Sequence, residues 1–137
     1  MPKRDLSNHP EAGQIIDFRY LARKDADSAA YAPPAIRPCL IWNAQAIETL
    51  QLVAVLPIAS GATGARVSIG EAERRALGLE STADVLFEEA NVFLWPGPHI
   101  ALQHDRTLVR PQRASKQLLD EIAAGMTGRS CTVVFRP

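Results

Sequence analysis

Cysteine, long apolar runs and targeting signals are scarce or missing in this sequence. The only two cysteines, Cys39 and Cys131, form no CxxC pair, so we expect two reduced, buried thiols in a cytoplasmic protein. The longest charge-free apolar run, 52–58, is far shorter than the roughly 20 residues that a membrane-spanning helix needs. The N-terminal segment has no apolar stretch of the kind found in secretory signals. Together these absences predict a soluble, cytoplasmic protein without membrane contacts.

An excess of charge of either sign is missing as well. The 137 residues include 15 Lys+Arg and 15 Asp+Glu. This balance argues against a protein that coats nucleic acid over its whole surface, but it is compatible with a local basic site. With 47% hydrophobic and 22% charged residues, the chain has the composition of a globular domain. A domain of this size needs neither a metal nor a disulfide for stability.

The motifs of several enzyme classes are also absent. His99 and His104 lie close in sequence beside Asp105, but a metal site needs three or four convergent ligands, so two surface histidines are the favoured interpretation. The glycine-rich segment 61–66 lacks the Gly-Lys-Ser/Thr ending of a phosphate-binding loop. No Gly-x-Ser-x-Gly elbow is present for a nucleophilic serine. The residues alone therefore predict no metal, no cofactor and no particular reaction.

Apolar patterning predicts a chain made mainly of strands. Residues 1–11 are polar and are expected to form a flexible leader, followed by a single domain over 12–137. Alternation between residues 14 and 20 places Ile16 and Phe18 on the face opposite Asp17, as in a half-buried strand. Further strands are expected at 39–42, 50–58, 66–69, 85–95 (as a pair or one bent strand), 105–109 and 131–135, with a loop or short helical turn at 43–48 and a long excursion at 22–36.

Two helices complete this prediction. Ser68 and Glu71 have the spacing of a capping box and Gly78 is a natural stop, so a short helix is expected over about 70–77. An amphipathic helix follows Pro111, with apolar residues at helical spacing up to Met126 that are expected to pack in the core rather than form a dimer or antitoxin seam. Connections before residue 70 have no room for the helix of a parallel βαβ unit. We expect a mainly β, α+β domain: a small barrel with short helices and a C-terminal amphipathic helix.

Three short segments resemble the MazF/PemK-like toxins. The segment Gly-Gln-Ile-Ile-Asp-Phe at 13–18 resembles the first strand of that family, and Arg-Pro-Cys-Leu-Ile-Trp-Asn at 37–43 resembles its Arg-Pro strand. The segment Leu-Pro-Ile-Ala-Ser-Gly at 56–61 resembles its Val-Pro-Ile/Val-Thr-Ser strand end, and the similarity covers roughly residues 12–95. The resemblance implies an SH3-like barrel, a cytoplasmic homodimer, and a growth-inhibiting toxin of a type II toxin–antitoxin system that an antitoxin protein neutralises.

The resemblance also implies an activity, since members of this family are mostly metal-independent endoribonucleases that cleave single-stranded RNA. The 2′-hydroxyl attacks the adjacent phosphate, which requires a base, an acid and donors for the phosphoryl oxygens. By resemblance, the catalytic residues are Arg37, whose planar guanidinium suits a phosphate, and Ser60, whose hydroxyl would donate to a phosphate oxygen. The expected RNA-binding residues are Arg23, Lys24, Arg66 and Asn91.

Several of these residues also have a purely structural interpretation. The alternative for Arg37 is an ion pair with an acidic residue of the long loop, and the alternative for Ser60 is a role in the turn before Gly61. The pair Glu88 and Glu89 is more typical of a solvated strand edge than of a cleft. The segment 93–98 is more typical of a packed turn than of a groove for an antitoxin peptide.

Two departures from the family pattern support a second hypothesis. The family threonine near the phosphate is Ala59 here, and the family segment Arg-Thr-Ile/Val-Asp falls at 91–94, which contains neither its arginine nor its aspartate. Losing one catalytic donor typically lowers the rate about 10²–10³-fold. The alternative is therefore a non-catalytic barrel that binds a partner protein or RNA. If the chain is an enzyme, Asn91, His99 and His104 are the candidates to replace the missing groups.

Overall fold

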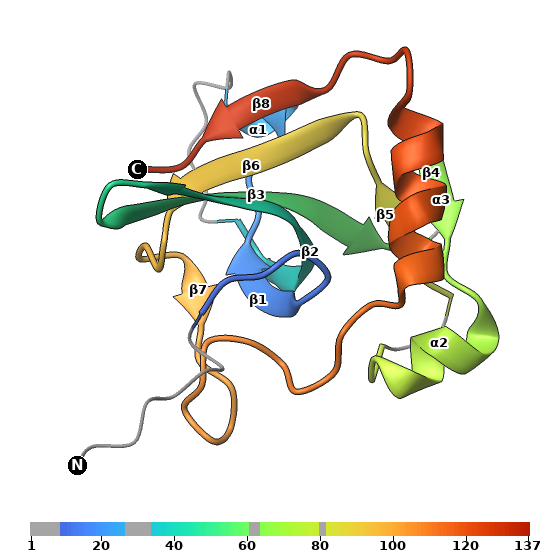
Figure 1. Cartoon of the computed structure of the whole chain (residues 1–137), viewed down its shortest axis with the longest axis horizontal. Helices are drawn as coiled ribbons and strands as arrows, with labels where there is room; N and C mark the ends of the chain where they lie inside the picture. The colour runs from blue at the N-terminus through green and yellow to red at the C-terminus, as the bar shows by residue number, and fades with distance from the viewer. Residues whose placement is uncertain (1–8, 27–33, 61–63, 80–81) are drawn as a thin grey trace.

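The fold comes from a computed structural model that describes residues 9–26, 34–60, 64–79 and 82–137. These residues form a mainly β structure with eight strands and three helices (Figure 1). The strands are β1 (Ile15–Arg19), β2 (Ile36–Ile47), β3 (Leu50–Ala59), β4 (Arg66–Ser68), β5 (Asp84–Leu86), β6 (Glu89–Leu94), β7 (Ile100–Ala101) and β8 (Thr132–Phe135). The helices are α1 (Arg23–Ala26), α2 (Glu71–Ala76) and α3 (Lys116–Met126).

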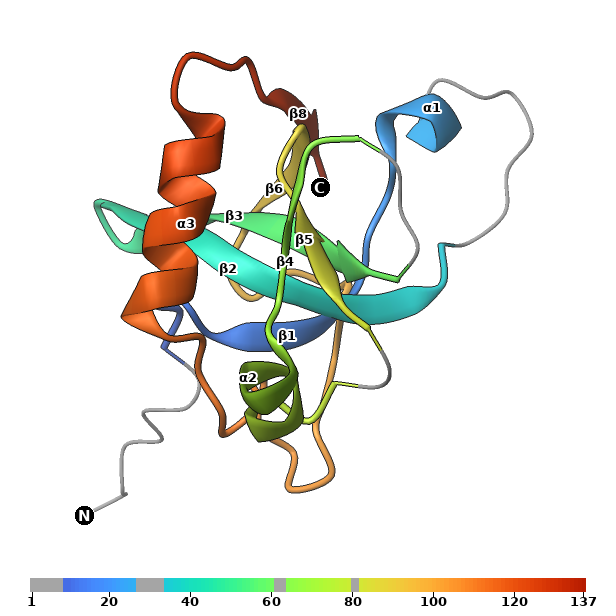
Figure 2. The same cartoon turned by 90° about the vertical axis from the view of Figure 1, so that its right-hand side faces the viewer.

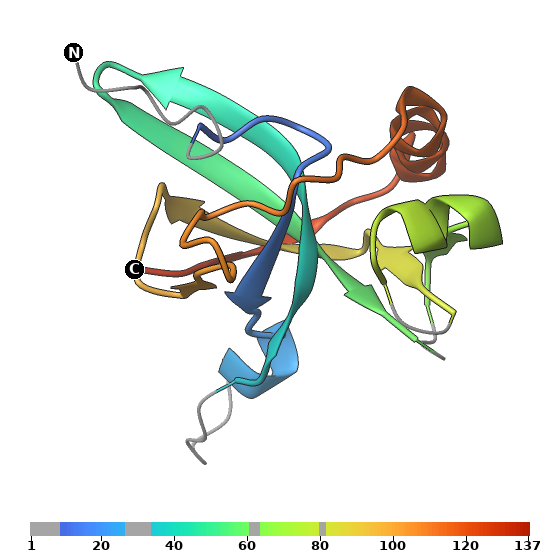
Figure 3. The ribbon, with the colours of Figure 1, turned by 90° about the horizontal axis from the view of Figure 1, so that it is seen from below.

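One sheet connects all of these strands. Its main path is β4-β5-β3-β2-β1-β7, with antiparallel pairing throughout, and β6 joins it at β3. Strand β8 pairs with β6 in parallel. The longest ladder is the β2–β3 hairpin, which reaches away from α2 and α3 (Figure 3). Among the described residues, the two ends of the path, β4 and β7, do not pair with each other, so the sheet is open.

Two hydrophobic clusters lie on opposite faces of the central strands. On one face, α3 packs against the sheet (Figure 2), and its buried Ile122 belongs to the same cluster as Leu56 of β3. On the other face, the rings of Phe18 and Phe93 stack with their centroids 4.7 Å apart. Consecutive side chains of a strand point to opposite faces, so each central strand contributes to both clusters. Burial on both faces explains why β3 is almost continuously apolar.

Much of the predicted element order is confirmed. The short helix near residue 70 is α2, the amphipathic C-terminal helix is α3, and the last predicted strand is β8. The segment 85–95 is a pair of strands, β5 and β6. Three predicted segments lie partly outside the described residues: 1–8 of the leader (1–11), 27–33 of the long excursion (22–36) and 61–63 of the glycine-rich segment (61–66).

Three local predictions were wrong. Residues 43–47 are not a loop but the second half of β2, because they pair with β3 beyond a bulge at Ile41/Asn43. Residues 105–109 form a turn rather than a strand, since both the N–H and the hydroxyl of Thr107 donate to the Asp105 carboxylate. Helix α2 begins at Gly70 without a side-chain cap, so the capping box does not form.

Within the described residues, the helices all fall short of the length and apolar character that crossing a membrane requires.

Candidate functional site

A pocket of about 340 Å³ lies beside α1, where the ends of several strands meet, and we call it the Arg37 pocket. Pro57 and Leu86 contribute apolar wall. The charged side chains of the pocket are Lys24, Asp25, Arg37, Glu88 and Glu89. Two cations and three carboxylates therefore face one concave surface, a combination that suits a phosphate ligand together with proton transfer.

Arg37 reaches this pocket because β2 leaves the core there. In the β1–β2 ladder it lies opposite Phe18, and the next residue on its face, Cys39, is fully buried. The Arg37 side chain is exposed, and within the described residues it makes no hydrogen bond or ion pair. Arg37 is thus a charged group on a rigid strand that is available to a ligand.

Lys24 is brought to the same pocket by the chain segment between β1 and α1, and Asn91 holds that segment in place. The Asn91 carboxamide accepts a hydrogen bond from the Leu21 N–H and donates one to the Leu21 carbonyl, both at 2.8 Å. Asn91 is fully buried. The structure therefore gives Asn91 a positioning role in place of the RNA contact suggested by the sequence. Its amide is also unavailable to replace a missing catalytic group.

Glu89 is likewise committed to structure. Its Oε1 accepts hydrogen bonds from the Tyr20 hydroxyl at 3.0 Å and from the Arg23 N–H at 3.2 Å. Burial, and then the neighbouring Glu89 charge, raise the pKa of Tyr20, so this hydroxyl stays protonated and remains a donor. The Glu89 carboxylate thus ties the end of β1 and the start of α1 to β6, at the base of the Arg37 pocket.

Glu88, in the bend between β5 and β6, is more exposed than its neighbour Glu89. One of its oxygens accepts a hydrogen bond from the Ala65 N–H at 2.6 Å. It is exposed, and it lines the Arg37 pocket together with Glu89. The sequence favoured a solvated strand edge for this pair, whereas the structure places both residues in a cleft.

Ser60 lies in a different pocket, of about 350 Å³, which we call the Ser60 pocket. There its hydroxyl is 3.1 Å from the hydroxyl of Thr82. Pro38 and Ile58 line the Ser60 pocket, whereas Arg37 and Pro57 line the Arg37 pocket. Because neighbouring side chains of a strand alternate between faces, the two pockets open on opposite sides of the β2–β3 ladder. The structure does not bring the two predicted catalytic residues together.

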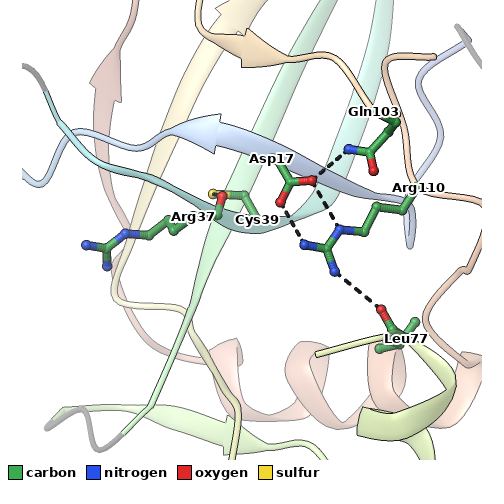
Figure 4. Close-up of polar contacts among 6 residues, drawn as sticks. All are labelled: Asp17, Arg37, Cys39, Leu77, Gln103 and Arg110. Carbon is green, nitrogen blue, oxygen red and sulfur yellow. Dashed lines mark hydrogen bonds and ion pairs between the residues drawn. The ribbon is translucent and has the colours of Figure 1, made fainter. Parts of the chain in front are cut away.

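An ion pair that the sequence did not reveal borders the Ser60 pocket. Arg110 donates from Nη2 and Nε to the two carboxylate oxygens of Asp17, at 2.7 and 3.2 Å, and Gln103 donates to the same carboxylate at 2.6 Å (Figure 4). Burial alone would raise the pKa of Asp17, but the hydrogen bonds and charge of Arg110, with Gln103, outweigh it and lower that pKa. Figure 4 also shows the Arg37 side chain pointing away from this pair.

The other predicted RNA-binding residues differ in their surroundings. Arg66 forms an ion pair with Asp84, with 3.6 Å between Nε and Oδ2, and donates to the Gly64 carbonyl. Arg66 follows Ala65, which lines the Arg37 pocket, but Arg66 itself is not one of the lining residues. Arg23 precedes Lys24 in α1, and its backbone N–H holds Glu89.

The histidines lie away from the Arg37 pocket. Burial, and then the charge of Arg136, lower the pKa of His99, whose ring is 3.2 Å from a guanidinium nitrogen of that arginine. His104 is exposed in the turn before Asp105. Neither histidine lines the pocket that holds Arg37. In the part of the chain that the structure covers, no three His, Cys, Asp or Glu side chains converge as a metal site.

Comparison of the chain with family models, with curated proteins and with solved structures finds no match. Evidence for a function therefore comes from the pocket residues and from the three segments of the sequence that resemble the toxin family, 13–18, 37–43 and 56–61.

Proposed function

We propose that this protein is a metal-independent endoribonuclease of the MazF/PemK-like toxin class that cleaves single-stranded RNA in the Arg37 pocket. The observation that carries the proposal is that Arg37 and Lys24 line one pocket with no ion pair to any described residue. Two cations that line one concave surface and form no ion pair with a described residue are available to an external anion. A phosphodiester is that anion in the proposed reaction.

The two cations have complementary roles in this proposal. The planar guanidinium of Arg37 would donate two parallel hydrogen bonds to phosphoryl oxygens and stabilise the charge that builds up on them. The ammonium of Lys24, as a compact charge, would attract the neighbouring phosphate. The formal net charge of zero does not oppose this function, because the local field around a cleft governs binding more than the total charge does. Arg66 would extend the RNA path along the rim.

The resemblance further implies an SH3-like barrel, a homodimer, and neutralisation by an antitoxin protein, and we propose these for the chain too. A surface for a second copy is available on the sheet beyond α3, which we call the uncharged sheet face. Five of its large apolar side chains, Ile47, Leu50, Leu94, Val133 and Phe135, are 42–56% exposed. Its residues, from β2, β3, β6 and β8, are Asn43, Gln45, Ile47, Leu50, Leu52, Ala54, Val92, Leu94, Val133 and Phe135. None is charged, so two copies can meet there around a twofold axis without like charges facing each other.

A second candidate function is a non-catalytic member of the same class that binds RNA or a partner protein. The observation that favours it is the separation of the two predicted catalytic residues. Ala59 and Ser60 line the Ser60 pocket, and Asn91 is buried. Among the described residues that line the Arg37 pocket there is therefore neither a serine or threonine hydroxyl nor a second arginine. In this candidate, the two cations bind RNA without cleaving it.

Metal-free incubation with RNA tests the proposal. Purified protein in EDTA is mixed with a single-stranded RNA of mixed sequence and with the corresponding DNA strand. We expect cleavage of the RNA alone, with fragments that end in a 2′,3′-cyclic phosphate, because the attacking group is the 2′-hydroxyl. RNA binding by fluorescence anisotropy without any cleavage at high protein concentration would support the non-catalytic candidate instead.

A further inference from the structure

We infer that Glu88 is the general base of the Arg37 pocket, the group that takes the proton from the attacking 2′-hydroxyl. This inference rests on the proposed function and adds the residue that the resemblance to known toxins did not provide. Glu88 lines the same pocket as Arg37 and Lys24, so its carboxylate faces the space where the phosphodiester would lie.

The backbone around residue 64 is shaped to hold this carboxylate. Ala65 donates its N–H to Glu88 Oε1 at 2.6 Å, and this is the only hydrogen bond that the carboxylate forms with a described residue. Gly64 has a φ of 99°, and a Cβ built there would collide with the same carboxylate oxygen. The positive φ favours glycine at this position, and the absence of a Cβ leaves room for the Glu88 carboxylate in its observed place. One oxygen is fixed by the turn, and the carboxylate stays exposed for a substrate.

The other proton acceptors around the pocket are less suitable. Glu89 already accepts hydrogen bonds from the Tyr20 hydroxyl and the Arg23 N–H. Tyr20 is itself a donor, and its raised pKa keeps it protonated. Cys39 lies beside Arg37, but its complete burial raises the pKa of the thiol and removes it from the pocket surface. Asp25 remains as a competitor, on the four-residue helix α1.

The proposed step moves one proton and exchanges one bond at phosphorus. The 2′-O–H bond breaks, its proton moves to Glu88, and the 2′-oxygen forms a bond to phosphorus. The bond from phosphorus to the 5′-oxygen breaks, and this oxygen leaves with the electron pair and takes a proton from water. The products are a cyclic phosphate and a 5′-hydroxyl, and Glu88 then returns its proton to solvent. No oxidant or reductant takes part.

Single-turnover cleavage by Glu88→Gln tests the inference. The substitution keeps an oxygen for the Ala65 N–H, so the fold and the turn are preserved, but it removes the basic group. We expect the cleavage rate to fall at least about 10²-fold. The acidic limb of the wild-type pH–rate profile should disappear, and the Kd for 2′-O-methylated RNA should change less than about 3-fold. Glu121→Gln, at an exposed position of α3, is the matched control and should cleave at the wild-type rate.

Cleavage at the wild-type rate by Glu88→Gln would overturn the assignment of Glu88 while leaving the nuclease proposal intact. If Asp25→Asn lost cleavage in the same assay, Asp25 would be the base instead. If the wild-type protein itself cleaves no RNA, the proposed function fails and the role of Glu88 fails with it.

Discussion

The buried amide of Asn91 leads to a specific prediction about stability. Its two hydrogen bonds to Leu21 fasten the segment between β1 and α1 to β6, and no part of the residue is exposed. In Asn91→Ala, the N–H and the carbonyl of Leu21 both lose their partner. Each unsatisfied polar group costs about 1–3 kcal/mol, so we expect the free energy of unfolding to fall by about 2–4 kcal/mol because Leu21 is itself only half-buried.

Asn91→Asp separates hydrogen bonding from packing. The carboxylate preserves the shape of the side chain and can still accept from the Leu21 N–H, but it cannot donate to the Leu21 carbonyl and places a charge in the core. We therefore expect Asn91→Asp to be at least as destabilising at neutral pH as Asn91→Ala. Gln112→Ala, at an exposed position before α3, is the control and should change the stability by less than about 0.5 kcal/mol.

Urea denaturation followed by circular dichroism measures these differences, with thermal melting as a second readout. A loss of 2–4 kcal/mol corresponds to a decrease of roughly 6–12 °C in Tm for a domain of this size. If Asn91→Ala unfolded within about 0.5 kcal/mol of the wild type, the amide would not hold the chain as described. The reasoning that removes Asn91 from the RNA-binding residues would then be refuted.

Three further predictions concern other parts of the molecule. Because the pKa of Asp17 is lowered in the folded protein, its ion pair with Arg110 stabilises the fold fully at pH values above the ordinary aspartate pKa of about 3.9. This stabilisation is lost as the pH falls through the lowered pKa of the folded protein. Urea denaturation should show Asp17→Asn about 2 kcal/mol less stable at pH 7, with a smaller difference at pH 3; an equal difference at both would contradict the ion pair. Phe135→Glu should convert the dimer into a monomer, as measured by sedimentation equilibrium. Leu102→Glu should not, because Leu102 is similarly exposed but lies outside the uncharged sheet face. A wild-type protein that is monomeric at high concentration would refute dimerisation through that face. Ala59→Thr should leave RNA cleavage unchanged because residue 59 lines the Ser60 pocket, and a marked gain in rate would place that pocket in the reaction.

Local patterns in the sequence predicted the elements that carry a clear apolar pattern within their own residues. The apolar repeat of α3 and the continuous apolar run of β3 identify both elements without reference to the rest of the chain. The second half of β2 was missed because residues 43–47 have no such pattern and become a strand by pairing with β3. Pairing with the long neighbouring strand of the hairpin is a tertiary interaction, and the apolar pattern of residues 43–47 alone does not reveal it.

The candidate site was predictable only in part, for a related reason. Arg37 was identified from the resemblance and Lys24 from its charge, and the two do line one pocket. Which face each strand residue occupies, however, depends on sheet register. That register separates Ser60 from Arg37. The alternation of β6 did carry a signal for Asn91, since it has the same parity as the buried Phe93. No local signal links Asp17 to Arg110, because the two residues are 93 positions apart in the chain.

The most direct test of the central claim compares Arg37→Ala with Ser60→Ala on the same single-stranded RNA in EDTA. Both positions are exposed and lie near the same end of the β2–β3 ladder, in pockets on its opposite sides. If RNA is cleaved in the Arg37 pocket, Arg37→Ala should lower the cleavage rate at least about 10²-fold with unchanged thermal stability, and Ser60→Ala should cleave at nearly the wild-type rate. Full cleavage by Arg37→Ala, or loss of cleavage in Ser60→Ala alone, would contradict the claim.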